Sequence, residues 1–299
     1  MAVSISRGER VFNGCNVVFM ILLSAWFIVP FVVVASTSVV GAAEAARRGG
    51  LVLIPQTFDL GAYHAIFAKG SAIIRSYGVT LFRVVVGTAL NLLFTAPFAY
   101  ALSKRSVPGR TPITMFVFFT ILFHGGLIPT YLVVRYTGLY NTLWALVIPQ
   151  LVNPFWMLIM RNFFFTIPES LEESALIDGA TPPMVLWKVV LPLSLPVLTT
   201  IGLFYAVWHW NSWFDAAIYI ADIRRMPVQI ILRRILINAT EVLNDNPEML
   251  YEMDAPPPPD AIKGAVIMVA TVPILFVYPF IQKYFVKGVL LGRLSLIHI

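Results

Sequence analysis

The sequence predicts an all-α membrane protein with six transmembrane helices. Its 299 residues are 59% hydrophobic and only 12% charged, whereas soluble domains carry about 25% charged residues. Several apolar runs also exceed the ~20 residues that a helix needs to cross a bilayer. These two observations exclude a soluble globular core. The single cysteine, Cys15, excludes an internal disulfide.

Six apolar segments are predicted to span the membrane. The first is longer than the apolar region of a cleaved signal peptide, which has ~7–15 residues, so we expect it to be retained. Prolines lie inside most of the segments, and membrane helices tolerate them as kinks because neighbouring helices can satisfy the freed carbonyl groups. The predicted spans are residues 12–36, 77–102, 112–134, 142–166, 191–213 and 262–284.

The links between these spans differ in length and charge. Residues 37–76 form a long polar link, residues 103–111 are short and basic, and the longest link is residues 214–261. That last link is too long for a simple turn. Its proline-dense end, MDAPPPPDA at 253–261, is expected to be extended rather than helical.

Lys and Arg are distributed almost evenly across the membrane. Six spans place both termini on one side, and apart from Arg83 the basic residues divide equally between the two sides. Those on the side of the termini lie in shorter loops, which favours cytoplasmic termini. Arg83 falls inside the second span, where we expect its long side chain to reach the head groups. A role in a transport pathway is the alternative.

An acidic stretch, PESLEESALIDGATPP at 168–183, separates the fourth and fifth spans. One interpretation is an amphipathic hairpin that lies at the membrane surface and only joins two spans. Interfacial helices usually carry Lys and Arg on their polar face, so the acidity favours a short helix that docks into a groove on a partner protein. The acids are Glu169, Glu172, Glu173 and Asp178.

Helix signals divide this stretch into two short helices. Ser170 and Glu173 fit a capping box at a helix start, and Gly179 fits the left-handed position that ends a helix. Thr181 and Pro182 then fit the first positions of a second helix. The sequence therefore predicts a helix, a glycine corner and another helix outside the bilayer.

The same stretch carries a resemblance to a known family. EESALIDGATPPMVLWKVVLPLSLP resembles the EAA loop of ABC-importer permeases, with Glu173-Ser174-Ala175 as the triplet and Gly179 as the glycine. Val189, Leu191 and Pro192 match the loop's ending, and Ser174 replaces the usual alanine by another small residue. The stretches FHGGLIPTYLVVRYTGLYNT, FYAVWHWNSWFDAAIYI and YPFIQKYFVKGVLLG resemble the carbohydrate-uptake branch, so the similarity covers about residues 77–292. The last seven residues, RLSLIHI, depart from the family pattern.

This resemblance implies a type I ABC importer fold in the bacterial cytoplasmic (inner) membrane. The loop at 167–190 and both termini would be cytoplasmic, and the link at 214–261 would be periplasmic. The implied partners are a second homologous permease, two cytosolic ABC ATPase subunits, an extracytoplasmic solute-binding protein, an oligosaccharide and the lipid bilayer, with no nucleic acid. The residues expected to couple to the ATPase are Glu172, Glu173, Ser174, Ala175, Asp178, Gly179 and Pro192.

The chain itself is not expected to be an enzyme. It contains no GxxxxGK[ST] phosphate-binding loop. No cofactor, metal site or catalytic residue is therefore predicted, and ATP and Mg²⁺ would be bound by the partner subunits. An ion-coupled secondary transporter is the alternative, but it would need carboxylates within the membrane, and the six spans hold almost no acid. A purely structural scaffold would not need the acidic helix pair.

The strongest candidate for a sugar pathway is YAVWHWNSWFD at 205–215. It combines aromatic faces with hydrogen-bonding groups, although an interfacial aromatic belt would also gather Trp and Tyr. A histidine beside two glycines in the third span is a second candidate; it could equally be a buried structural residue, with the glycines permitting close helix packing. The predicted pathway residues are His124, Tyr205, Trp208, His209, Asn211 and Trp213.

The identity of the sugar is not encoded directly. Four arginines in the external link could favour an acidic oligosaccharide, such as fragments of alginate or pectin. Alternatively, they could contact lipid or partner carboxylates. These residues are Arg224, Arg225, Arg233 and Arg234.

Overall fold

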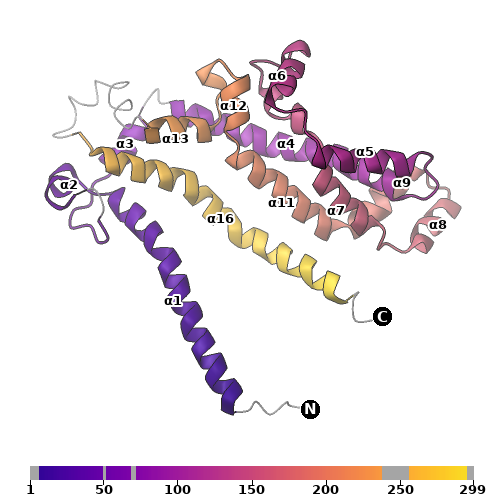
Figure 1. Ribbon diagram of the computed structural model, residues 1–299, viewed down its shortest axis with the longest axis horizontal. Coiled ribbons are helices and arrows are strands. Elements are labelled where there is room, and N and C mark those ends of the chain that lie inside the picture. The colour runs from indigo at the N-terminus through magenta and orange to yellow at the C-terminus, as the bar shows by residue number, and fades with distance from the viewer. Residues whose placement is uncertain (1–6, 50–51, 69–71, 238–255, 295–299) are drawn as a thin grey trace. The chain divides into compact units, whose positions relative to one another are not determined.

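The computed structural model describes residues 7–49, 52–68, 72–237 and 256–294. Every regular element in these ranges is a helix, which confirms the predicted all-α fold class (Figure 1). The chain divides into two compact units. One comprises Met1–Ser71 and Leu232–Val272, and the other comprises Ala72–Ile231 and Pro273–Ile299.

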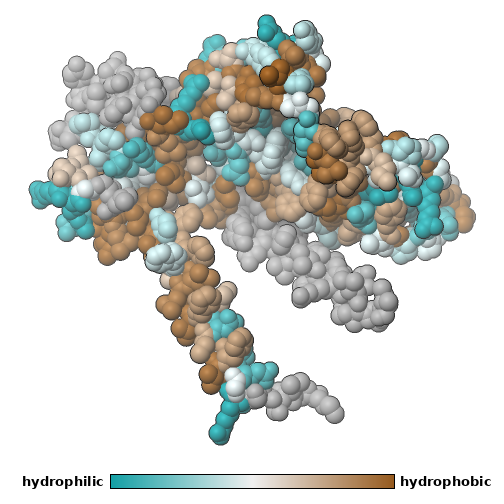
Figure 2. All heavy atoms as spheres, viewed as in Figure 1, coloured by the Kyte–Doolittle hydropathy of each residue, from teal (hydrophilic) through white to brown (hydrophobic). Residues whose placement is uncertain are grey.

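The first helix of the chain, α1 (Arg7–Thr37), is apolar, and none of its most hydrophobic 18 residues is buried. Figure 2 shows apolar side chains covering most of its visible face. A helix that is apolar all round needs lipid or another apolar partner around it. With 31 residues, α1 is long enough to cross the bilayer.

The link after α1 is folded around one carboxylate. It contains α2 (Ala42–Arg48) and α3 (Gly61–Ile66). Glu44 is buried and accepts hydrogen bonds from the hydroxyl of Thr57 at 2.7 Å and from the backbone N–H groups of Gln56 and Thr57 at 2.9 and 2.8 Å. These bonds, chiefly that from the Thr57 hydroxyl, lower the pKa of Glu44 to about 2.

This lowered pKa predicts an acid-sensitive link. The folded-state pKa of Glu44 is below its ordinary value of 4.5. The ionised Glu44 therefore stabilises the folded link above that pH, and this stabilisation is lost as the pH falls towards 2. We expect the amide protection factors of Gln56 and Thr57 in hydrogen exchange to drop between pH 6 and pH 3. Glu44→Gln should already lower them at pH 6. Equal protection in both proteins at pH 6 would contradict this.

The core of the second unit is formed by three helices. They are α4 (Ala72–Ser103), α7 (Pro154–Phe164) and α11 (Leu195–Asn211), which pack side by side (Figure 1). Small side chains on α4, Ala96 and Ala99, are buried against this cluster. Small residues allow membrane helices to approach closely.

Three of the predicted spans are bent rather than straight. The third is divided into two helices at 117°, the fourth is bent by 50° before α7, and the fifth by 86° before α11. Within the described residues, three helices are long and apolar enough to cross a membrane alone, and six spans result if each bent pair counts as one. In the third span, α5 (Arg110–Leu122) precedes the bend and α6 (Leu127–Tyr136) follows it. In the fourth, η1 (Leu143–Leu146) and η2 (Ile148–Gln150) precede the bend. In the fifth, the bend follows α9 (Pro182–Val185), the π-helical turn η3 (Leu186–Val190) and α10 (Leu191–Leu193).

The described part of the 214–261 link is helical over most of its length. It contains α12 (Phe214–Tyr219), η4 (Ile223–Arg225) and α13 (Val228–Ile237), while residues 238–255 lie outside the described residues. The backbone N–H of Val228 donates to the Thr80 hydroxyl of α4 at 2.8 Å. This bond joins the start of α13 to α4, a core helix of the second unit.

The expectation that 253–261 contains no helix was wrong at its end. The last helix, α16 (Pro259–Leu294), begins at a proline. Proline is favoured at the first helical position, because its fixed φ suits a helix and the missing N–H would be unpaired there anyway. Of the last seven residues, 295–299 lie outside the described residues.

Candidate functional site

The first half of the acidic stretch forms α8 (Glu169–Ile177). Its N-cap is Pro168, with φ −59° and ψ 128°, and no side chain caps the helix. The predicted capping box was therefore wrong. The helix starts one residue before Ser170, whose carbonyl accepts a bond from the Ser174 hydroxyl at 2.8 Å. The proline fixes the chain direction where the helix begins.

A glycine corner ends this helix as predicted. Gly179 has φ +86°, and its N–H donates to the Leu176 carbonyl at 3.0 Å. The N–H of Ala180 donates to the Ala175 carbonyl at 2.9 Å. This pair of bonds is the Schellman motif, which satisfies the last carbonyls of a helix. Thr181 then has extended geometry, and α9 begins at Pro182.

Glu172, one of the residues expected to couple to the ATPase, points inward. The residue is 7% exposed. Its carboxylate forms an ion pair with Lys104, just beyond the end of α4, and accepts a bond from the Tyr100 hydroxyl at 2.9 Å. The Lys104 ammonium also lies 4.7 Å from the centroid of the Tyr100 ring. Through these contacts Glu172 joins α8 to the end of α4, a core helix of the same unit.

The other predicted coupling residues lie mostly at the surface. Glu173, Ser174, Asp178, Gly179 and Pro192 are exposed, whereas Ala175 is half-buried and packs against the core. Three apolar side chains of α8 are also exposed: Leu171 at 44%, Leu176 at 47% and Ile177 at 86%. Exposed apolar side chains gathered on one short helix are typical of a protein-binding surface.

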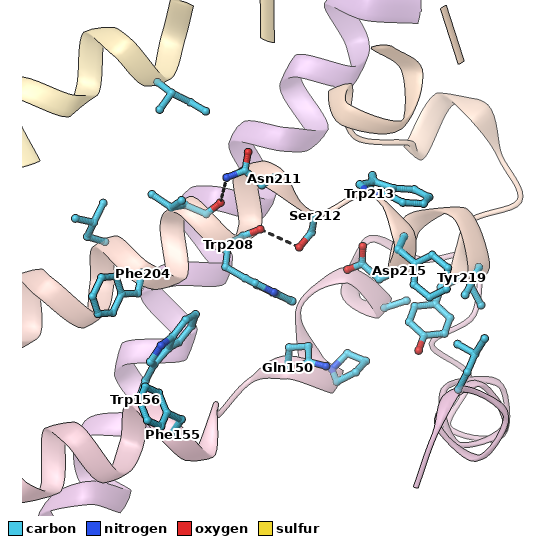
Figure 3. A pocket seen from close by; sticks show the side chains of 18 residues that line it. Gln150, Phe155, Trp156, Phe204, Trp208, Asn211, Ser212, Trp213, Asp215 and Tyr219 are labelled. Carbon is cyan, nitrogen blue, oxygen red and sulfur yellow. Dashed lines mark hydrogen bonds between the residues drawn. The ribbon is translucent and has the colours of Figure 1, made fainter. Parts of the chain in front are cut away.

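A cavity of about 1120 Å³ lies in the second unit (Figure 3). Three of the six predicted pathway residues line it: Trp208, Asn211 and Trp213. Its wall also includes Asp215, from the same sequence stretch, and residues that the sequence did not suggest. These additional residues include Gln150, Phe155, Trp156, Phe204 and Tyr219.

The remaining three predicted pathway residues do not line the cavity. Tyr205 is buried, and its hydroxyl bonds to the Thr95 hydroxyl and accepts from the Asn153 N–H, both at 2.9 Å. His124 is exposed at the break between α5 and α6. Gly126 is the N-cap of α6, with φ +88°, and a Cβ there would meet nothing within 4 Å, so no close helix contact among the described residues requires this glycine.

His209 belongs instead to a buried polar chain. Its Nδ1 accepts a bond from Arg83 Nε at 3.2 Å, so its proton lies on Nε2, which donates to Asn91 Oδ1 at 2.7 Å. The Asn91 amide then donates to the carbonyls of Gln150 and Leu151, both at 2.8 Å. The chain joins α4, α11 and the segment that precedes α7.

Arg83 starts this polar chain, and the expectation that it reaches the head groups was wrong. Its side chain is 0% exposed and forms a two-pronged ion pair with Asp215 of α12. Its guanidinium carbon lies 5.3 Å from the centroid of the Trp208 ring. A buried charge is tolerated when it is paired and hydrogen-bonded, as it is here.

The polar chain depends on a glycine in α4. A Cβ at Gly87 would lie 2.5 Å from His209 Nε2. We therefore expect Gly87→Ala to displace the imidazole and to destabilise the protein by about 1–3 kcal/mol. Gly78→Ala on the same helix is the matched control, since its Cβ would meet nothing within 4 Å. Thermal unfolding of both variants in detergent measures this, and equal midpoints would contradict it.

Two of the four arginines proposed to attract acidic sugars are engaged by groups of this chain. Arg224 pairs with Asp222 at 3.1 Å, and Arg225 contacts both Asp222 and the Asn141 carbonyl. The hydrogen bond from the Arg224 side chain is the largest cause that lowers the pKa of Asp222. Arg233 and Arg234 are exposed on α13.

Known proteins resemble this chain over nearly its whole length. A family model described as the binding-protein-dependent transport system inner membrane component matches residues 6–291. Protein LplC of Bacillus subtilis (strain 168) is 45% identical over 290 residues, covering 97% of each chain. The polygalacturonan/rhamnogalacturonan transport system permease protein YtcP of the same organism is 44% identical over 287 residues, covering 96% of this chain and 99% of YtcP.

A solved structure shares the fold. It is the crystal structure of a bacterial ABC transporter involved in the import of the acidic polysaccharide alginate. One of its chains matches with a TM-score of 0.86 and 33% identity, covering 94% of this chain and 99% of that chain. These findings confirm both the predicted resemblance and the type I importer fold. The chain therefore belongs to the family of binding-protein-dependent transport system inner membrane components.

Proposed function

We propose that this chain is one permease subunit of an ATP-driven importer that moves an acidic oligosaccharide across the cytoplasmic membrane by alternating access. The family membership supports the transport role. Two similar proteins support the cargo class, since one is named for polygalacturonan transport and the other belongs to an importer of alginate. Both of these polymers consist of uronic acids, which carry a carboxylate on each sugar ring.

The observation that carries the proposal is the construction of α8. It exposes Glu173 and the apolar side chains of Leu171, Leu176 and Ile177. On the same helix, the buried Glu172 binds Lys104 and Tyr100. A helix that exposes apolar side chains and is also ion-paired to the core of its own unit is suited to receive force from a partner, and we assign that partner as a cytosolic ABC ATPase.

The remaining partners follow from the same assignment. A second homologous permease completes the pathway, two ATPase subunits bind ATP and Mg²⁺, and an extracytoplasmic binding protein delivers the sugar. Segment 167–190 and both termini then face the cytoplasm. The alternative of an ion-coupled transporter is disfavoured at the cavity, because Asp215, which lines it, is already ion-paired with Arg83.

Reconstitution of the complete assembly in proteoliposomes tests the function. ATP hydrolysis and uptake are measured with the binding protein and either trigalacturonate or neutral galactotriose. We expect trigalacturonate to stimulate both activities and galactotriose to have little effect. Stimulation by the neutral sugar alone would reject the acidic cargo. Uptake that needs an ion gradient but no ATP would reject the importer assignment.

A further inference from the structure

The cavity described above contains groups that an apolar ligand would not require. Its lining is mostly aromatic and aliphatic, yet it also includes Gln150, Asn211 and Asp215, which Figure 3 labels. Placing a charge in a membrane-embedded unit is costly unless it is paired. Lipid tails would form no hydrogen bonds with these polar side chains, whereas a polyhydroxylated ligand needs polar side chains as hydrogen-bond partners for its hydroxyls.

The carboxylate of Asp215 has one acceptor position left for a ligand. A carboxylate has about four acceptor positions. Oδ1 accepts from Arg83 at 3.1 Å and from the Ala216 N–H at 2.9 Å, and Oδ2 accepts from the second guanidinium nitrogen. The side chain is 20% exposed while that of Arg83 is fully buried. Among the described residues, Asp215 can therefore accept one further bond from the cavity side.

Trp208 provides an aromatic surface close to this carboxylate. Figure 3 shows its ring projecting into the cavity between Gln150 and Asp215. The ring also lies near the guanidinium group of Arg83 and the imidazole of His209, with centroid distances of 5.3 and 4.8 Å. These neighbours hold the indole in place. Aromatic faces carry partial negative charge, which attracts the weakly positive C–H groups on one face of a pyranose ring.

We propose that Trp208 and the Arg83-held carboxylate of Asp215 form a subsite for one pyranose ring of the cargo within this permease. The ring stacks on Trp208 and donates one hydroxyl hydrogen bond to Asp215. The volume of about 1120 Å³ is slightly above the ~300–1,000 Å³ of typical small-molecule sites, so neighbouring sugar rings can lie beside it. This inference rests on the proposed function and assigns to this chain a direct contact with the sugar.

Photo-crosslinking locates the cargo directly. A diazirine derivative of trigalacturonate is presented with the binding protein and ATP to the complete wild-type assembly. We expect crosslinked peptides from the segment 204–215 of this chain. Crosslinks confined to the second permease, or labelling of 204–215 by a diazirine lipid that trigalacturonate does not displace, would overturn the subsite. An assembly with no uptake at all would instead reject the proposed function.

Substitution of the stacking residue separates recognition from packing. Trp208→Leu should lower the uptake rate about tenfold, equivalent to about 1.4 kcal/mol. Trp208→Tyr, which keeps an aromatic face, should retain most of it. Trp144→Leu is the matched control, because Trp144 lies outside the cavity lining and is 45% exposed. Equal uptake by the Leu and Tyr variants would overturn the stacking role.

Discussion

Gly179→Pro is expected to abolish uptake by the assembled importer. Gly179 has φ +86°, and a proline ring holds φ near −65°. Proline also removes the N–H that donates to the Leu176 carbonyl. A non-glycine residue in this region costs about 1–3 kcal/mol even when it fits, so the corner would rearrange. The exposed face of α8 would then meet the ATPase in the wrong direction.

A matched substitution distinguishes the shape of the corner from the absence of a side chain. Gly179→Asn keeps the N–H, and asparagine tolerates the left-handed conformation. A Cβ at this position would meet nothing within 4 Å. We expect the Asn variant to co-purify with the ATPase and to retain uptake, and the Pro variant to lose both. Wild-type uptake by Gly179→Pro would remove the basis for the docking assignment.

Glu172→Lys is expected to uncouple ATP hydrolysis from uptake. The substitution would place two ammonium groups together at a largely buried contact, where breaking an ion pair costs about 3–5 kcal/mol. Helix α8 would lose its attachment to the end of α4. The number of sugars taken up per ATP hydrolysed measures this directly and should fall. The adjacent Glu173→Lys should instead prevent ATPase binding, because Glu173 is exposed.

Charge reversal at both positions is the control for this contact. Lys104→Glu combined with Glu172→Lys restores opposite charges across the same gap. We expect the double variant to recover much of the coupling ratio that either single variant loses. A double variant no better than the two singles would show that the contact does not carry the coupling.

The attachment of α8 matters because gating needs a large differential free energy. Reversing a 1:99 population of two states takes about 5.5 kcal/mol of differential binding. If α8 could move relative to α4, part of this binding free energy would be lost in that movement. Glu172 connects α8 to α4, and α4 packs against α7 and α11 in the core. The contact therefore links the surface proposed to bind the ATPase with the helices that surround the cavity.

Local backbone features such as helix ends could be predicted from the sequence, but the direction in which a side chain points could not. The glycine corner follows from Gly179 and its neighbours alone, and the structure agrees. Glu172 and Glu173 are adjacent and chemically identical, and the one that turns inward finds its partners, Tyr100 and Lys104, 72 and 68 residues away in the chain. Similarly, Arg83 was expected at the head groups because its partner, Asp215, lies 132 residues further along.

For the cavity, too, the sequence did not reveal which side chains face it. The stretch at 205–215 was recognisable from its aromatic and polar residues, and part of it lines the cavity. Tyr205 and His209 lie on the same helix but face the core. Gln150 and Trp156 come from a distant segment and reach the cavity only because α7 packs on α4 and α11. Prolines occur in most spans, so they could not indicate which spans bend.

The most direct test of the central claim is crosslinking from the exposed face of α8. The sole cysteine, Cys15, is replaced by Ser, and Ile177, 86% exposed, is replaced by Cys and labelled with benzophenone maleimide. Our account predicts that illumination joins this chain to the ATPase subunit and that the yield changes when ATP is added. Crosslinks only to lipid or to the extracytoplasmic binding protein would contradict it.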